Sequence, residues 1–199
     1  MGTIAMAGRT VDRARREAWA LAGFGTWMIV GLFLDGWAHR ESKPESFFSP
    51  WHGVLYSGFA AAVLWFAVQA RRAGERSAVE DRAGTLGMAL FAGGAIGDFV
   101  WHQVFGIEAD LETLLSPTHL LLMTGGLLML TAPIRWAWTS DDVGDRPTMG
   151  TFAPVLVGTT LTVSVVTFFF MYMSAAWPVA WDGSNQGQRS ASRACWRAT

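Results

Sequence analysis

Five long apolar stretches alternate with short polar segments along the chain. The apolar stretches cover residues 18–39, 50–70, 84–105, 116–138 and 151–177. Each has roughly the length of about 20 residues that an α-helix needs to cross a lipid bilayer. The pattern therefore predicts an all-α integral membrane protein, a bundle of five transmembrane helices.

The composition strengthens this prediction. Hydrophobic residues make up 51% of the chain, charged residues only 16%, and there are 11 Trp and 13 Phe. This is too apolar for a typical soluble domain, and the aromatic content is typical of membrane proteins. The net charge of −1 gives no indication of nucleic-acid binding. The predicted partner is the lipid bilayer, with other membrane subunits or a second copy of the chain (a homo-oligomer) as further partners.

The basic residues predict how the helices are oriented. Most lie on one side of the predicted bundle, namely Arg9, Arg13, Arg15, Arg16, Arg71, Arg72, Arg76, Arg82, Arg135 and Arg146. Apart from the C-terminal segment, only Arg40 and Lys43 lie on the other side. Because basic loops stay in the cytoplasm, we predict a cytoplasmic N-terminus and an extracytoplasmic C-terminus in the plasma (inner) membrane. Residues 1–17 are then a basic cytoplasmic segment before an uncleaved helix, and residues 182–199 a polar, disordered tail.

One polar pattern occurs twice in this apolar chain. Both copies read D-x-x-x-H followed by E-[ST]-x-x-S-P-x-H, and together they hold all 4 histidines. The residues are Asp35, His39, Glu45 and His52 in the first copy, and Asp98, His102, Glu112 and His119 in the second. Each copy spans one pair of predicted helices. The chain is therefore predicted to form two tandem helical hairpins, residues 18–70 and 84–138, plus one extra helix, residues 151–177.

The spacing predicts that each copy gathers its polar side chains at the outer end of its hairpin. Asp35 and His39 are four residues apart, so they lie on one face of a helix. Ser49 followed by Pro50 is typical of a helix N-cap and first helical position, which places His52 in the first turn of the next helix. Antiparallel helices bring these two ends together. The same reasoning gathers the second set, which is Asp98, His102 and His119, with Ser116 and Pro117 at the cap.

One carboxylate and two imidazoles make a set of metal ligands. Such a set suits zinc, copper, iron or manganese and leaves an open coordination position. Ionisable residues at membrane depth are costly and are usually functional. Glu45 and Glu112 are interpreted as residues that orient a histidine, as loop acids in water, or as fourth ligands. The alternative without a metal is a pair of Asp–His contacts at helix ends that gene duplication has retained.

The first set resembles a known membrane copper site. The spacing Asp35-x3-His39-x12-His52 is similar to that in the C subunit of particulate methane monooxygenase and ammonia monooxygenase. In that family a second set follows in a later hairpin, usually with Asn where this chain has Asp98, and with a shorter gap than that from His102 to His119. The resemblance covers residues 31–126, and this chain has one or two helices fewer. The resemblance implies bound copper, oxygen chemistry and partner subunits.

Several functions are consistent with these residues. The first is a membrane copper-binding protein with Asp–His–His sites on the extracytoplasmic side, either an oxygenase-like subunit or a copper-handling protein. A zinc-dependent membrane hydrolase, with Glu45 or Glu112 as general base, is an alternative, and so is a b-type haem protein with His39 and His102 as axial ligands. A transporter is disfavoured because all the ligands cluster at one end of the helices. The sequence leaves open whether the two sets form one composite site or two separate sites.

Overall fold

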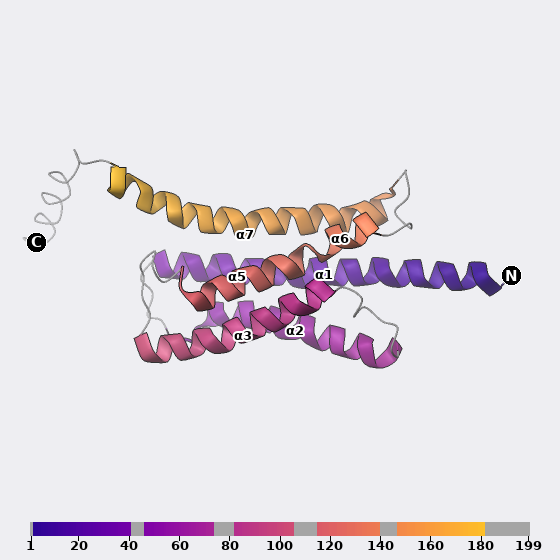
Figure 1. Ribbon diagram of the computed structural model, residues 1–199, viewed down its shortest axis with the longest axis horizontal. Helices are drawn as coiled ribbons and strands as arrows, with labels where there is room; N and C mark the ends of the chain where they lie inside the picture. Colours follow the sequence, from indigo (N-terminus) through magenta and orange to yellow (C-terminus); the bar gives the residue numbers. More distant parts are fainter. Residues whose placement is uncertain (1, 41–45, 74–81, 106–114, 140–146, 182–199) are drawn as a thin grey trace, which may run out of the picture.

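The protein is a bundle of long, roughly parallel and antiparallel helices (Figure 1). A computed structural model describes residues 2–40, 46–73, 82–105, 115–139 and 147–181. The helices are α1 (Gly2–Arg40), α2 (Pro50–Ala73), α3 (Arg82–Phe105), α5 (Pro117–Leu130), α6 (Ala132–Thr139) and α7 (Met149–Trp181). No strand occurs in these described ranges. The all-helical prediction is confirmed, whereas the predicted disordered tail, residues 182–199, lies outside the described residues.

Five segments are long and apolar enough to cross a membrane, as predicted from the sequence. They are Arg15–His39, Pro50–Val68, Arg82–Phe105, Pro117–Trp138 and Met149–Met171. Large apolar side chains point outward from them, for example Leu64, Ile96 and Phe170, which are 65%, 69% and 67% exposed. Exposed apolar surface on this scale suits contact with lipid rather than water. One difference concerns the N-terminus, where α1 continues through the basic segment back to Gly2 as a single helix.

The fourth apolar stretch is broken, although the sequence pattern predicted one element over residues 116–138. Helix α5 ends at Leu130 and α6 begins at Ala132. Pro133 has no backbone N–H, so one helical hydrogen bond is lost at this point. Arg135 stabilises the break, because its Nη2 donates to the Leu128 carbonyl oxygen over 2.8 Å and its Nη1 donates to Thr131 Oγ1 over 2.5 Å. The break lies at the end of the bundle opposite to the predicted metal ligands.

Within each of the two helical hairpins, the paired helices make close backbone contacts at glycines. Helix α1 packs along α2, and α3 packs along α5, while α7 lies against α1, α5 and α6. A Cβ atom on Gly31 would lie 2.5 Å from the backbone nitrogen of Leu55, and one on Gly125 would lie 2.6 Å from that of Phe91. Small residues at such crossings let membrane helices approach closely. This packing sets the distance between the helix ends that carry the histidines.

Candidate metal centre

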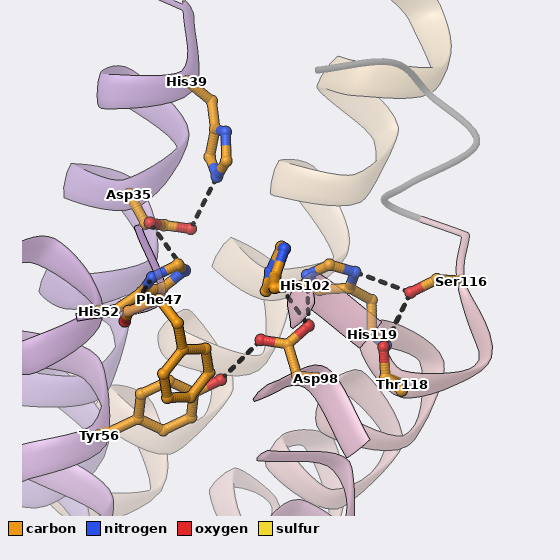
Figure 2. A network of polar contacts seen from close by, with 10 residues as sticks. All are labelled: Asp35, His39, Phe47, His52, Tyr56, Asp98, His102, Ser116, Thr118 and His119. Carbon is orange, nitrogen blue, oxygen red and sulfur yellow. Dashed lines mark hydrogen bonds and ion pairs between the residues drawn. The ribbon is translucent and has the colours of Figure 1, made fainter. Parts of the chain in front are cut away.

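The first predicted set of ligands meets where α1 ends and α2 begins (Figure 2). His39 Nε2 lies 3.5 Å from Asp35 Oδ2, and His52 Nε2 lies 3.3 Å from Asp35 Oδ1. The predicted cap is confirmed, since the backbone N–H of His52 donates to Ser49 Oγ over 3.3 Å. His52 is 4% exposed, whereas Asp35 and His39 are only partly buried. Solvent exposure within the group therefore decreases from His39, which is partly accessible, to His52, which is buried.

A backbone contact places one hydrogen on the His52 ring. Its Nδ1 lies 3.1 Å from the carbonyl oxygen of Phe47. A carbonyl can only accept a hydrogen bond, so Nδ1 carries the hydrogen. In the neutral ring, Nε2 then presents a lone pair, and it presents it toward Asp35 Oδ1. That carboxylate oxygen is buried and accepts no hydrogen bond from any described residue. When Nε2 is deprotonated, these two electron-rich atoms face each other across a position that a cation could occupy.

The second set of ligands meets where α3 ends and α5 begins. His102 Nε2 and His119 Nε2 lie 3.5 Å and 3.4 Å from the same atom, Asp98 Oδ1. Asp98 is 1% exposed, and within the described part of the chain its Oδ1 accepts no hydrogen bond. Ser116 caps α5 as predicted, and its Oγ also lies 2.9 Å from His119 Nδ1. The side chain that starts the helix thus also orients the histidine.

The two sets adjoin each other and form one composite cluster. Among the described residues, two compact groups have ligand atoms that all lie within 4.8 Å of one another: Asp35–His39–His52 and His52–Asp98–His102. The second group crosses between the hairpins, and it includes His52 in place of the predicted His119. The four imidazoles follow one another, with ring centroids 6.4 Å apart for His39–His52, 6.0 Å for His52–His102 and 6.3 Å for His102–His119.

The spacing of these atoms fits a small transition-metal ion. Ligands at about 2.0–2.1 Å from a tetrahedral ion are separated by about 3.3–3.4 Å along each edge of the tetrahedron. The separations between carboxylate oxygens and imidazole nitrogens are 3.3–3.5 Å. A metal-ligating histidine usually donates its other ring N–H to a carbonyl oxygen, as His52 does to Phe47. The donor set could therefore hold a metal ion, and the ligand atoms within each compact group lie within 4.8 Å of one another.

Two further residues, neither of which belongs to the repeated Asp–His pattern, shape the cluster. Tyr56 donates its hydroxyl hydrogen to Asp98 Oδ2 over 2.9 Å, from α2 to α3. The Phe47 ring stacks on Tyr56, with centroids 5.5 Å apart, and meets Phe99 of α3 at 5.0 Å. Tyr56 follows His52 by four residues, so it shares that face of the helix. This four-residue spacing is the sequence feature from which the position of Tyr56 could have been predicted. Nothing in the sequence indicates the role of the Phe47 carbonyl.

An apolar cavity of about 120 Å³ opens beside the cluster. Five of the ligand candidates line one part of it, together with Tyr56. Its other walls are apolar and come from all the long helices, with Leu32, Leu55, Phe91, Leu122, Val165 and Phe168 among them. A small uncharged molecule in this cavity would lie next to the metal position.

Glu45 and Glu112, the predicted additional or orienting acids, lie outside the described residues. The other predicted site residues lie together at one end of the bundle, as their positions along the helices require. Comparison of the chain with models of protein families, with curated proteins and with solved structures found no match. The chemistry of the cluster is therefore the basis for a functional assignment: its Asp and His groups could hold a metal ion.

Proposed function

We propose that the protein is an integral membrane copper-binding protein whose clustered Asp–His–His groups face the extracytoplasmic side, and that it acts as an oxygenase-like subunit. The observation that carries the proposal is the pairing of two buried carboxylate oxygens, Asp35 Oδ1 and Asp98 Oδ1, with imidazole nitrogens at 3.3–3.5 Å. Each oxygen is buried and accepts no hydrogen bond from the described residues. A cation between each oxygen and the imidazole nitrogens that face it would satisfy that oxygen.

The cost of burial favours a metal over simple Asp–His pairs. Removing a carboxylate from water costs several kcal/mol unless a charge partner and hydrogen bonds compensate. Asp98 is 1% exposed and has one hydrogen-bond donor among the described residues, the neutral Tyr56 hydroxyl. A divalent ion supplies a positive charge and also uses the imidazole lone pairs.

Two arguments support copper. Nitrogen and oxygen ligands bind copper(II) more strongly than any other divalent ion of the first transition row. The spacing of Asp35, His39 and His52 also resembles that of a family with a membrane copper site. When bound, copper would supply one-electron chemistry with oxygen. The chain itself orients the ligands, keeps water away from Asp98, and offers an apolar cavity close in size to one of ~150 Å³ that takes up benzene.

Elemental analysis of detergent-purified protein tests the proposal, with no metal or chelator added. We expect copper, and we expect it to fall in the Asp35→Ala/His39→Ala variant. Zinc that falls in the variant would move the assignment to a hydrolase, and a Soret band would move it to a haem protein. The absence of metal, together with failure to take up added copper or zinc, would refute a metal function.

Single substitutions test the ligand assignment. His39→Ala and His102→Ala should each lower the metal content while the helical circular dichroism spectrum remains unchanged. Gln103→Ala is the matched control, because Gln103 is exposed and directly follows His102. If both histidine variants bind as much metal as the unmodified protein, these histidines are not ligands. If the purified protein contains copper, oxygen consumption with a reductant then tests the oxygenase-like activity.

A further inference from the structure

The two aspartates of the cluster are held differently, although the sequence copies around them match. Asp35 divides its oxygens between two histidines, since Oδ2 faces His39 and Oδ1 faces His52. Asp98 presents the single atom Oδ1 to both His102 and His119. Its other oxygen, Oδ2, accepts the hydrogen bond from Tyr56. Figure 2 shows this hydroxyl reaching across from the first hairpin to the aspartate of the second.

The difference originates in the sequence. Tyr56 stands four residues after His52, and the matching position after His119 is Met123. A methionine has no hydroxyl group to donate. The chain therefore places one phenol at the junction of the hairpins, and that phenol is bonded to Asp98.

Packing holds the Tyr56 ring in the orientation that this hydrogen bond requires. The ring stacks on Phe47, with centroids 5.5 Å apart and planes inclined by 29°. It also meets Phe91 of α3 edge-on, with centroids 6.5 Å apart. A hydrogen bond from a hydroxyl to a carboxylate is stronger than one between neutral groups, and it strengthens further in a site of low dielectric constant.

We propose that Tyr56 is a positioning residue that restricts Asp98 to metal ligation through Oδ1, and so makes the two compact groups of the cluster unequal. This inference rests on the proposed metal-binding function and applies to any divalent transition-metal ion. The group around Asp35 keeps both carboxylate oxygens available. The group around Asp98 offers one oxygen, held in a fixed direction. The two positions therefore bind a metal ion with different affinity and different coordination.

Cobalt(II) is a suitable probe, because its visible absorption reports coordination number and it binds the same nitrogen and oxygen ligands as zinc and copper. Two backgrounds isolate the two groups. His39→Ala leaves the group around Asp98, and His102→Ala leaves the group around Asp35. Tyr56→Phe is then added to each background, which removes the hydroxyl and keeps the ring.

We expect Tyr56→Phe to act on one background only. In the His39→Ala protein it should weaken cobalt binding by about 10–100-fold, the usual effect of losing a partner that orients a ligand, and it should change the cobalt spectrum. In the His102→Ala protein the affinity and the spectrum should stay as they were. Ser57→Ala is the matched control, because it removes an exposed hydroxyl from the next position on α2, where Ser57 bonds only to the Val54 carbonyl among the described contacts.

Three results would overturn the inference. If Tyr56→Phe lowers the melting temperature but leaves both cobalt titrations and both spectra unchanged, Tyr56 only joins the helices. If it changes both backgrounds equally, it does not distinguish the two groups. If the unmodified protein binds no cobalt, copper or zinc, the proposed function itself fails, and the inference fails with it.

Discussion

The substitution Gly125→Ala tests whether close packing of α3 against α5 sets the geometry of the metal centre. The new Cβ atom would lie 2.6 Å from Phe91 N and 2.7 Å from the Gly87 carbonyl oxygen. Ordinary contact begins at 3.4 Å, so the helices must separate by about 0.8 Å (3.4 minus 2.6). Overpacking of this kind costs about 1–3 kcal/mol, and alanine recovers about 0.5–1 kcal/mol of helix propensity. We expect a net loss of up to about 2.5 kcal/mol.

The neighbouring substitution Gly126→Ala is the control. Its Cβ atom would meet the Phe91 ring at 3.9 Å, an ordinary contact, so it should be neutral or slightly stabilising. Thermal unfolding in detergent, followed by circular dichroism, measures both variants. Gly125→Ala should also weaken metal binding, because Asp98 and His119 lie on the two helices that it pushes apart. Equal melting temperatures for the two variants would show that this contact does not limit the approach of the helices.

Three further perturbations have defined outcomes. Acidification from about pH 7 to about pH 5 should release bound metal, since imidazoles must be deprotonated to act as ligands; dialysis at each pH followed by metal analysis measures this, and retention at low pH would contradict histidine ligation. Ser116→Ala should cost about 1 kcal/mol of stability through loss of the helix cap, and it should also weaken metal binding, because Ser116 orients His119. A drop in melting temperature without any change in metal affinity would show that Ser116 caps the helix but does not orient a ligand. Arg135→Met should destabilise the protein by about 1–3 kcal/mol, because the Leu128 carbonyl loses a charged donor, while metal content stays constant; an unchanged melting temperature would show that the arginine does not support the helix break.

The hairpins and the position of the cluster could be predicted because they follow from local rules. Asp35 and His39 share a helix face through their spacing, and Ser49 and Ser116 act as caps because their side chains accept the hydrogen bonds that free N–H groups at a helix start require. An antiparallel connection then brings the helix ends together. These steps need only the helical period and the chain direction.

The remaining features depend on contacts between residues that are distant in sequence or on backbone atoms. The group that joins His52 to Asp98 and His102 requires a defined placement of one hairpin against the other, which no local pattern provides. The Phe47 carbonyl is a backbone atom, so residue identity gives no information about it. The break at Thr131 is marked in the sequence by Pro133, but a proline near a membrane helix end is tolerated where another group satisfies the freed carbonyls, and Arg135 does so here.

The contacts of Phe47 link the metal ligands of the first hairpin to the second hairpin. Its carbonyl orients His52 of the first hairpin, while its ring is held against Phe99 of the second hairpin. Membrane helices insert first and associate afterwards. The first hairpin alone therefore lacks the Phe99 contact with Phe47, although it carries Asp35, His39 and His52. We expect each half alone to hold a metal ion less tightly than the docked hairpins, because the first half lacks Phe99 and the group around Asp98 in the second half lacks His52.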